Sequence, residues 1–385
     1  MLPSAGLDAA FWIFAACCGA LHLALAALLA LGWARIGRPD GGTPPVSVLV
    51  AAHNERALLP ALLEALRAQR YPDYEVIIAA DRCTDGSLEW LRSQARAWPQ
   101  LRVVEIPETP PGWSPKKWAL QQAAAEAAHA HWLLTDADCT MGPDWIRCMA
   151  AAFGSGTELV LGLGWYLQHP GLLNRFIQWE TWYTAFQYAG AAALGLPYMA
   201  VGRNLAYTRG FFIRSGGPGA FRARLSGDDD LPVNHFADPA RTRVCILPEA
   251  ATWSVPPRSW RAWLRQKQRH LSASPAYTRR SRALLGAFHL GHLGFYAGIL
   301  VSLPNFQTLI PAIALYFLRL ALWWPLAASA QRKAGQQALT GWLPLLDFCV
   351  FLYNLTVTPA GLMKVPSWTS SRPDYRETPS KTATS

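Results

Sequence analysis

Four long apolar segments constrain this chain more than any other feature of its sequence. The first runs from Phe11 to Trp33, is interrupted only by His22, and is long enough to cross a bilayer core of about 30 Å as a helix. Three more lie toward the other end: Leu284–Leu303, Phe306–Ala328 and Trp342–Met363. Charged residues make up 16% of the chain, against about 25% in typical soluble proteins. We therefore expect an integral membrane protein with one amino-terminal helix and two or three carboxy-terminal helices, the last either spanning or interfacial.

A cleaved secretory signal is the other interpretation of the first segment. Such signals have a basic start and an apolar core of roughly 7–15 residues. Here the apolar stretch is longer, and no Lys or Arg precedes it, which favours a retained anchor. Arg35 and Arg38 follow this segment, and Arg279, Arg280 and Arg282 precede the second. Since basic residues gather on the cytoplasmic side of spans, the residues between them are predicted to face the cytoplasm.

The formal net charge of +10 raises the possibility of a nucleic-acid partner. Much of the excess lies near the membrane ends, including residues 258–282, and attraction to anionic lipid headgroups explains it more simply. We therefore expect the bilayer, and no nucleic acid, as a partner. The seven cysteines show no CxxC spacing, so a cytoplasmic domain is predicted to contain neither disulfide nor zinc site.

Between the apolar segments, short apolar runs typical of buried strands alternate with helical patterns. The expected strands cover 46–52, 74–80, 101–106 and 132–135, and the expected helices cover 55–68, 88–97 and 117–128. This alternation predicts an α/β domain with a mostly parallel sheet and helices on both faces, which binds ligands beyond the carboxyl ends of its strands. The predicted divisions are a membrane anchor at 1–36, a cytoplasmic domain at 45–272, a membrane region at 283–364 and a disordered tail at 365–385.

Polar residues follow three of these strands. The groups are His53-Asn54-Glu55, a second run that includes Asp81 and Asp85, and Asp136-Ala137-Asp138. One such tip alone could be a helix cap, for which Asp85 is well placed. In an extended segment, residues two apart face the same side, so Asp136 and Asp138 could form an oxygen site for Mg²⁺ or Mn²⁺ shared with substrate phosphates.

Three further groups lie outside the strand tips. Asp228, Asp229 and Asp230 are adjacent carboxylates, which suit either a solvated turn or a general base for a hydroxyl acceptor. Gln266 and Arg269 lie three residues apart and could hold a diphosphate from one helix face, although a basic helix at the membrane surface fits as well. Lys116 and Lys117 offer further cations for phosphate, or are simply solvated.

The order of these groups resembles glycosyltransferase family 2, whose nucleotide-sugar-binding domain is an α/β fold of the GT-A type. The resemblance runs from about Val46 to His270. The matching segments are His53-Asn54-Glu55, Asp81 with Thr84-Asp85-Gly86-Ser87, Lys116-Lys117-Trp118-Ala119-Leu120, Asp136 with Asp138, Gly202-Arg203-Asn204-Leu205-Ala206-Tyr207, Asp228-Asp229, and Gln266 to His270. Two positions depart from the family pattern: His270 replaces the tryptophan of the QxxRW box, and Asp228 replaces glutamate.

The resemblance implies inverting hexosyl transfer from a nucleotide-diphosphate sugar, with these residues in stated roles. Asp81 and Asp136 would bind the nucleoside, and Gln266 and Arg269 would hold the diphosphate. The rest of the nucleotide-sugar site would comprise His53, Asn54, Glu55, Asp85, Lys116, Lys117 and His270. Asp138 and Asp136 would bind the metal, and Asp229, or its neighbours Asp228 and Asp230, would be the base. Gly202, Arg203 and Asn204 would face the acceptor. The metal would neutralise the departing diphosphate.

The acceptor is predicted to be a membrane lipid, as in the ceramide-glucosyltransferase-like and carotenoid- or lipid-directed members that the chain resembles. Residues 165–199 are rich in aromatic side chains, which favour membrane interfaces as well as cores, and we hypothesise that this stretch lies against the bilayer. A processive polysaccharide synthase is the nearest alternative, although so few helices make a thin channel. A non-catalytic nucleotide-sugar binder is the alternative from another class, but such a protein has no need to retain all four of Asp81, Asp136, Asp138 and Asp229.

Overall fold

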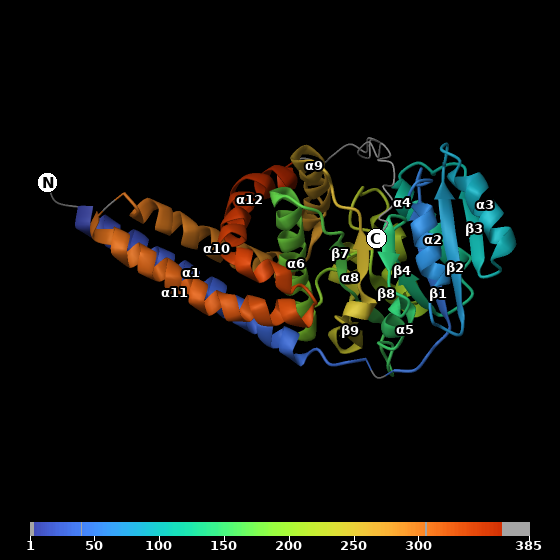
Figure 1. Ribbon diagram of the computed structural model, residues 1–385, viewed down its shortest axis with the longest axis horizontal. Helices are drawn as coiled ribbons and strands as arrows, with labels where there is room; N and C mark the ends of the chain where they lie inside the picture. Colours follow the sequence, from blue (N-terminus) through green and yellow to red (C-terminus); the bar gives the residue numbers. More distant parts are fainter. Residues whose placement is uncertain (1–3, 40, 305, 364–385) are drawn as a thin grey trace, which may run out of the picture.

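The computed structural model describes residues 4–39, 41–304 and 306–363, so the predicted tail at 365–385 lies outside the described residues. A long amino-terminal helix, α1 (Ser4–Arg35), leads through a linker to a seven-stranded sheet with the order β3-β2-β1-β4-β8-β6-β9 (Figure 1). The strands are β1 (Val46–Ala52), β2 (Tyr74–Asp81), β3 (Leu101–Ile106), β4 (His131–Leu134), β6 (Leu159–Leu161), β8 (Leu205–Thr208) and β9 (Thr242–Val244). The four strands β3-β2-β1-β4 are parallel, and β8 runs antiparallel to β4 and β6. The predicted mostly parallel α/β sheet is therefore confirmed.

Helices cover both faces of this sheet. They are α2 (Leu59–Arg67), α3 (Ser87–Ala97), α4 (Pro115–Ala125) and α5 (Trp145–Ala150). The helix predicted from residue 55 begins four residues later, because Asn54 adopts a left-handed backbone conformation (φ 55°) and Pro60 occupies the first turn, where proline is tolerated. Likewise, α4 begins at Pro115 rather than at Lys117, again with proline in its first turn.

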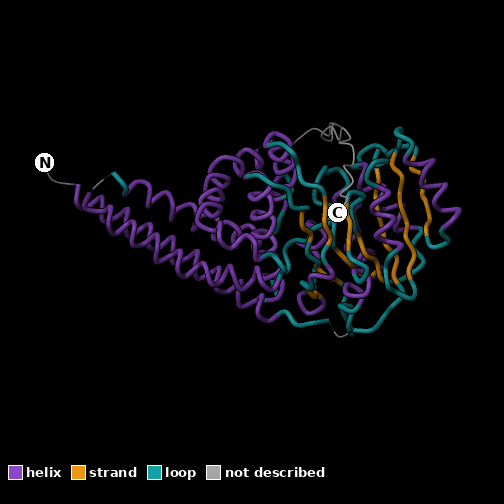
Figure 2. The backbone as a smooth tube through the Cα atoms, viewed as in Figure 1, coloured by secondary structure: helices purple, strands orange, loops and turns teal. Residues whose placement is uncertain are grey.

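A smaller sheet and further helices lie between the main sheet and the long apolar helices from the two ends of the chain. The sheet has the order β5 (Cys139–Met141), β10 (Thr252–Ser254), β7 (Gly164–Tyr166). The helices here are α6 (Leu172–Ala193), α7 (Arg209–Ser215), α8 (Asp230–Phe236) and α9 (Trp260–Leu271), and the 3-10 turns of the chain are η1 (Gly217–Phe221), η2 (Pro239–Arg241), η3 (Pro248–Ala250), η4 (Ser274–Ala276) and η5 (Gln337–Trp342). Figures 1 and 2 show α6 and α9 standing beside the sheet, on the side that faces the membrane helices.

Helix α6 carries the aromatic stretch, and its side chains are core rather than bilayer-facing. Trp179, Trp182 and Phe186 are each 0% exposed, so our hypothesis that this stretch lies against the bilayer is wrong for its side chains. They pack against the membrane helices: Trp182 and Phe186 contact Trp323 of the long helix α11 (Phe306–Lys333) at ring-centroid distances of 6.2 and 5.4 Å. The aromatic stretch therefore joins the α/β domain to the long apolar helices.

The crossing of α1 and α6 depends on two glycines. A Cβ atom on Gly32 would lie 2.2 Å from the carbonyl oxygen of Gly190, and one on Gly190 would lie 2.7 Å from the carbonyl oxygen of Leu29. Both distances are far below van der Waals contact, so the backbones can approach this closely only without side chains, as is common where helices pack tightly. Helix α1, the predicted anchor, therefore packs directly against helix α6 of the α/β domain.

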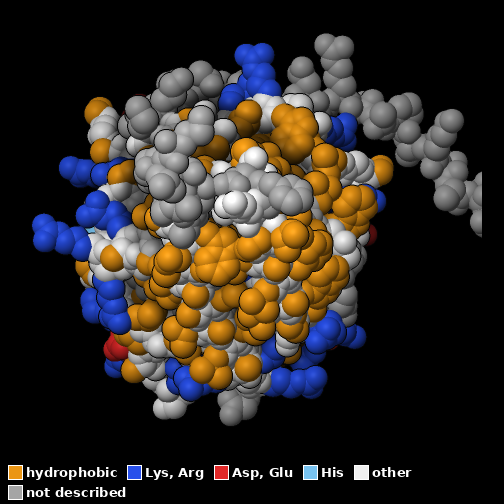
Figure 3. Space-filling view, turned by 90° about the vertical axis from the view of Figure 1, so that its left-hand side faces the viewer, with side chains coloured by type: hydrophobic (Ala, Val, Ile, Leu, Met, Phe, Trp, Pro, Cys, Tyr) orange, Lys and Arg blue, Asp and Glu red, His pale blue; other side chains and the backbone are white. Residues whose placement is uncertain are grey.

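Four described helices are long and apolar enough to cross a membrane. They are α1, α10 (Arg279–Ser302), α11 and α12 (Leu343–Met363). In Figure 1, α1, α10 and α11 run side by side away from the sheet, whereas α12 lies near α6 and α9. The end of the molecule opposite the sheet presents an apolar face with Lys and Arg at its margin (Figure 3). Six exposed arginines between residues 258 and 282 form no ion pair with the described part of the chain.

A buried polar cluster joins the membrane helices. Asp347 Oδ2 accepts hydrogen bonds from Arg319 Nη1 and Tyr296 OH, both at 2.7 Å, and Asp347 Oδ1 lies 3.3 Å from His292 Nε2. Arg319 Nη2 also lies 3.3 Å from His22 Nδ1, so the cluster links α1, α10, α11 and α12. Arg319 and Asp347 are 2% and 0% exposed. Polar groups at this depth are costly unless they pair with one another, as they do here.

We expect Asp347→Asn to destabilise the protein strongly, because it leaves the Arg319 guanidinium buried without a counter-charge. Breaking a buried ion pair from one side costs about 3–5 kcal/mol. Thermal unfolding in detergent measures this loss, with Thr356→Val as a control on the same helix, since the Thr356 hydroxyl bonds only its own helix carbonyl at Leu352. An Asp347→Asn variant as stable as that control would show that the ion pair does not hold the helices together.

Candidate active site

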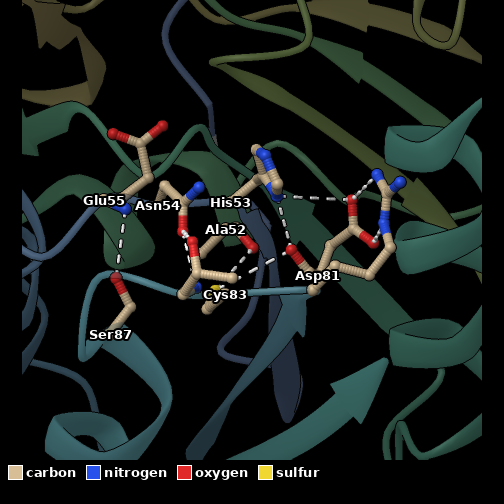
Figure 4. A network of polar contacts seen from close by, with 9 residues as sticks. Ala52, His53, Asn54, Glu55, Asp81, Cys83 and Ser87 are labelled. Carbon is tan, nitrogen blue, oxygen red and sulfur yellow. Dashed lines mark hydrogen bonds and ion pairs between the residues drawn. The ribbon is translucent and has the colours of Figure 1, made fainter. Parts of the chain in front are cut away.

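The carboxyl ends of β1 and β2 bring the first two predicted groups together (Figure 4). His53 Nδ1 lies 2.6 Å from the backbone oxygen of Asp81, and Asn54 Oδ1 accepts a hydrogen bond from the Thr84 backbone N–H at 2.8 Å. Asparagine tolerates the left-handed conformation that this turn requires. The loops after the two strands therefore hold each other in place at the edge of the sheet.

Asp81 has a partner that the sequence did not indicate. Arg82 donates to both of its carboxylate oxygens, from Nε at 2.8 Å and from Nη2 at 2.9 Å. A residue adjacent to Asp81 in the sequence is not expected to donate both of these hydrogen bonds, because neighbours in an extended strand point to opposite sides. Arg82 instead has a left-handed backbone (φ 46°), which turns its guanidinium back onto Asp81. The predicted nucleoside-binding carboxylate is thus fixed in orientation.

Asp85 holds a turn rather than facing a ligand. Its Oδ1 accepts from the Ser87 backbone N–H at 3.0 Å and from Ser87 Oγ at 2.5 Å, and its Oδ2 accepts from the Arg56 backbone N–H at 2.9 Å. Glu55 is 3% exposed, and its backbone N–H donates to Ser87 Oγ at 3.1 Å. These contacts fit the cap-like alternative for Asp85, and we leave it out of the proposed ligand contacts.

Asp136 and Asp138 lie in the turn between β4 and β5. Both are partly exposed, while the intervening Ala137 is buried, so the two carboxylates face outward as their spacing predicts. Lys116 Nζ lies 2.8 Å from Asp136 Oδ1 and 3.0 Å from Asp228 Oδ2. Burial lowers the pKa of Lys116, but the two carboxylates outweigh this effect and raise it overall. Lys116 therefore joins the DxD turn to the acidic triplet as a permanent cation.

The three consecutive aspartates have three different surroundings. Asp228 faces Lys116, whereas Asp229 caps α8 by accepting from the Asp230 backbone N–H at 2.9 Å and also accepts from the Gly202 N–H. Asp230 is buried, and its Oδ2 accepts from Tyr277 OH at 2.5 Å. Burial, reinforced by Asp228, raises the pKa of Asp229 to about 6, and burial with the charge of Asp229 raises that of Asp230 as well.

Two predicted site residues prove to be internal supports. Lys117 is 0% exposed, and its Nζ donates to the carbonyl oxygens of Phe221 and Ser226, both at 2.9 Å, which fixes the loop before the acidic triplet. Asn204 is also 0% exposed, and its amide Nδ2 donates to two backbone carbonyls at 2.7 Å. Neither side chain can contact a nucleotide or an acceptor from these positions, so both assignments are corrected.

The helix α9 brings the basic box to the same site. His270 lies close enough to Lys267, Arg269, Arg203 and Lys116 for their charges to act on its imidazole. Residues that are far apart in sequence therefore come near one another at α9.

A buried ion pair that the sequence did not indicate fixes α9 in place. Lys267, within the box, pairs with Glu180 of α6, and both side chains are 9% exposed. Glu180 lies in the middle of an aromatic helix and accepts a hydrogen bond from Thr184, four residues later in the same helix. Nothing in the sequence indicates that its partner is on another helix.

Residues 44–273 match the sequence profile described as glycosyltransferase like family 2. The match covers most of the α/β domain and every site group described above. The chain therefore belongs to glycosyltransferase family 2, and its α/β domain has the GT-A-type fold.

Individual relatives support this membership. The chain is 26% identical over 234 residues to the probable glycosyltransferase YdaM of Bacillus subtilis strain 168, covering 59% of this chain and 54% of the relative. It is 29% identical over 120 residues to the putative glycosyltransferase EpsH of the same organism, covering 31% and 33%. The chain thus spans about half or less of the length of the curated relatives it matches. Its fold is similar to that of the mannosyltransferase PcManGT from Pyrobaculum calidifontis, solved with GDP-Man and Mn²⁺, with a TM-score of 0.56, 20% identity, and coverage of 90% and 99%.

Proposed function

We propose that this glycosyltransferase transfers one sugar from a nucleotide-diphosphate sugar to the hydroxyl of a membrane lipid, with inversion at the anomeric carbon. The observation that carries the proposal is the meeting of the DxD turn and the Asp228–Asp230 turn, bridged by Lys116 at 2.8 and 3.0 Å. A donor site and a base for the acceptor must lie within one sugar of each other, and the contacts of Lys116 with both turns support this arrangement. His53, Asn54, Glu55 and Asp81 complete the proposed nucleoside side, and Gln266, Arg269 and His270 the diphosphate side.

The DxD turn fits a divalent cation. The described residues hold no group of three or more His, Cys, Asp or Glu side chains that could bind a metal without help. Mg²⁺ does not require one, since it commonly binds one or two carboxylates and takes its remaining ligands from water and substrate phosphates. The fold relative PcManGT was solved with Mn²⁺. We propose that Asp138, with Asp136, holds Mg²⁺ or Mn²⁺, which neutralises charge on the departing diphosphate.

Asp229 is the proposed general base. Its carboxylate is held by two backbone N–H groups, from Gly202 and Asp230, so its orientation is fixed before a substrate arrives. It would take the proton of the acceptor hydroxyl as the oxygen attacks the anomeric carbon from the side opposite the diphosphate. A single displacement of this kind inverts the configuration and needs one base and no protein nucleophile.

The bilayer is the proposed source of the acceptor. Helix α9, which carries the basic box, packs on α12, and a Cβ on Gly361 of α12 would lie 2.7 Å from Leu271 of α9. The diphosphate side of the site thus rests directly on a helix that is apolar enough to lie in a membrane. The six exposed arginines of this region, which are Arg258, Arg261, Arg265, Arg279, Arg280 and Arg282, would meet anionic headgroups, with the catalytic domain on the cytoplasmic side.

The pH dependence of the reaction follows from the raised pKa of Asp229. The base must be ionised, so kcat/KM is expected to rise about tenfold per pH unit below about pH 6 and to level off above it. Asp228→Asn removes a neighbouring negative charge, lowers the pKa of Asp229 and moves this acidic limb to lower pH. Initial rates between pH 4.5 and 8.5 measure both effects. A flat profile across this range would exclude Asp229 as a base with a raised pKa.

Nucleotide release from purified protein in detergent tests the proposed function. UDP-, GDP-, ADP- and CDP-sugars are screened with Mn²⁺ or Mg²⁺, with and without total membrane lipid extract. We expect release of a nucleoside diphosphate from one donor class, stimulated by the lipid. Stimulation by water-soluble acceptors alone would contradict the lipid acceptor. Tight nucleotide binding without release from any donor would favour a non-catalytic binder.

A further inference from the structure

The side chain of Arg203 packs against two neighbouring strands of the small sheet, the outer strand β7 and the central strand β10. Its Nη2 donates to the carbonyl oxygen of Gly164 at 2.8 Å, and its Nη1 donates to Ser254 Oγ at 3.3 Å. The ring of Tyr166 lies against the guanidinium, with 4.3 Å between Cζ and the ring centroid. Gly164 and Tyr166 belong to β7 and Ser254 to β10, so three residues of the small sheet hold one side chain.

The glycine at position 164 leaves room for the Arg203 side chain. A Cβ atom at Gly164 would lie 2.3 Å from Arg203 Nε and 2.7 Å from its Cγ, so the side chain fits only against a glycine. The backbone of Arg203 is held too, because its carbonyl oxygen accepts from Thr135 Oγ1 and Thr252 Oγ1, both at 3.0 Å. A long, flexible side chain is thereby fixed in one orientation before any ligand binds.

The charge of Arg203 has no counter-charge in the protein. No carboxylate of the described residues lies within ion-pairing distance of it, and its buried Nε–H has no acceptor among them. A guanidinium has five N–H groups; two donate to Gly164 and Ser254 and the Nε–H is buried, so at most the two remaining Nη N–H groups are left for a ligand. The buried Arg319, by contrast, is paired with Asp347 at 2.7 Å. A fixed cation with spare donors and no carboxylate partner indicates an anionic ligand.

The position of Arg203 identifies where that anion would lie. Gly202, its neighbour, donates to Asp229, and Thr135, which holds its carbonyl oxygen, directly precedes Asp136. The charge of Asp136 acts on the guanidinium, although the two groups form no ion pair. An anion bound by Arg203 would therefore lie between the proposed base and the DxD turn.

We propose that Arg203 binds a phosphate group of a substrate. This inference rests on the proposed function above. The planar fork of Arg203 can donate two parallel hydrogen bonds to phosphate oxygens. The phosphate belongs either to the diphosphate of the donor, where Arg203 would help the leaving group depart, or to a phosphorylated lipid acceptor, where it would select acceptors that carry this group.

Titration calorimetry of Arg203→Gln and Arg203→Lys distinguishes these sources. Three probes are used. The first is inorganic pyrophosphate with Mn²⁺, and the second, also with Mn²⁺, is whichever of UDP, GDP, ADP and CDP the unaltered protein binds most tightly. The third is the corresponding nucleoside, which has no phosphate. Arg243→Gln is the matched control, because Arg243 is exposed on β9 and donates only to the nearby carbonyl oxygens of Ala240 and Thr242. The thermal unfolding midpoint of each variant verifies folding, and the acceptor KM is measured alongside.

If the phosphate is the donor's, Arg203→Gln weakens nucleoside diphosphate and pyrophosphate about ten- to a hundredfold, Arg203→Lys less, and the nucleoside not at all. If it is the acceptor's, nucleotide binding stays unchanged and the acceptor KM rises by a similar factor. Unchanged nucleotide binding and an unchanged acceptor KM in the folded Arg203→Gln variant would overturn this inference but not the proposed function. Failure of the unaltered protein to bind any of the nucleotides would remove the proposed function, and this inference with it.

Discussion

Asp229→Asn is expected to lower kcat by about a hundred- to ten-thousandfold, the range that a positioned general base contributes. Asparagine keeps one side-chain oxygen, which can still cap α8 by accepting from the Asp230 N–H, while the bond from the Gly202 N–H is lost, so the fold should persist. Nucleotide affinity should change little, because the base faces the acceptor. Steady-state kinetics and nucleotide titration on the same preparation separate the two quantities.

Asp238→Asn is the matched control for this substitution. Asp238 is exposed and caps the turn η2 through the Ala240 N–H at 2.9 Å, so the same exchange there removes a capping carboxylate outside the site. It should leave kcat unchanged. If Asp229→Asn retains more than about a tenth of the activity, a loss well below what a general base supplies, then Asp229 is not the base, and Asp228 becomes the next candidate.

The second large effect is expected from the DxD turn. Asp138→Ala removes a proposed metal ligand, and a metal that stabilises the leaving group contributes several kcal/mol, so kcat/KM should fall by about a thousandfold. Asp138 is partly exposed, so its truncation leaves no cavity in the core. Chelation of divalent ions by EDTA should have a comparable effect on the unaltered protein, reversed by added Mn²⁺ or Mg²⁺.

Asp73→Ala serves as the control for Asp138→Ala. Asp73 is exposed just before β2, at the opposite end of the sheet from the site. Its loss should change neither activity nor metal dependence. Full activity after exhaustive chelation, or an Asp138→Ala variant as active as Asp73→Ala, would contradict the assignment of the DxD turn as a metal site.

Local patterns in the sequence predicted most of the sheet. The strands at 46–52 and 101–106 have their predicted bounds, because continuous apolar runs between turn residues are typical of buried parallel strands. The DxD aspartates could be placed for the same reason: they directly follow such a strand. The start of α2 could not, since it depends on the left-handed conformation of Asn54, and that conformation is stabilised by a contact with Thr84 of the neighbouring loop.

Contacts between distant segments explain what the sequence analysis missed. The contacts of Arg203 involve Gly164 and Ser254, 39 and 51 residues away, and the partner of Lys267 lies on α6. A sequence motif does not reveal contacts between residues so far apart in the chain. The burial of Lys117 and Asn204 is a tertiary property of the same kind, so residues inside a matching motif divide into those that face the ligand and those that support it.

The most direct test of the central claim is the mass of the product. Purified protein is incubated with the donor that supports nucleotide release and with membrane lipid extract, and the lipids are analysed by mass spectrometry, with Asp229→Asn as the inactive reference. We expect one lipid class to gain the mass of a single sugar with the unaltered protein alone. A ladder of added sugars would identify a processive synthase instead. Transfer to water-soluble acceptors with no modified lipid would contradict the proposed function.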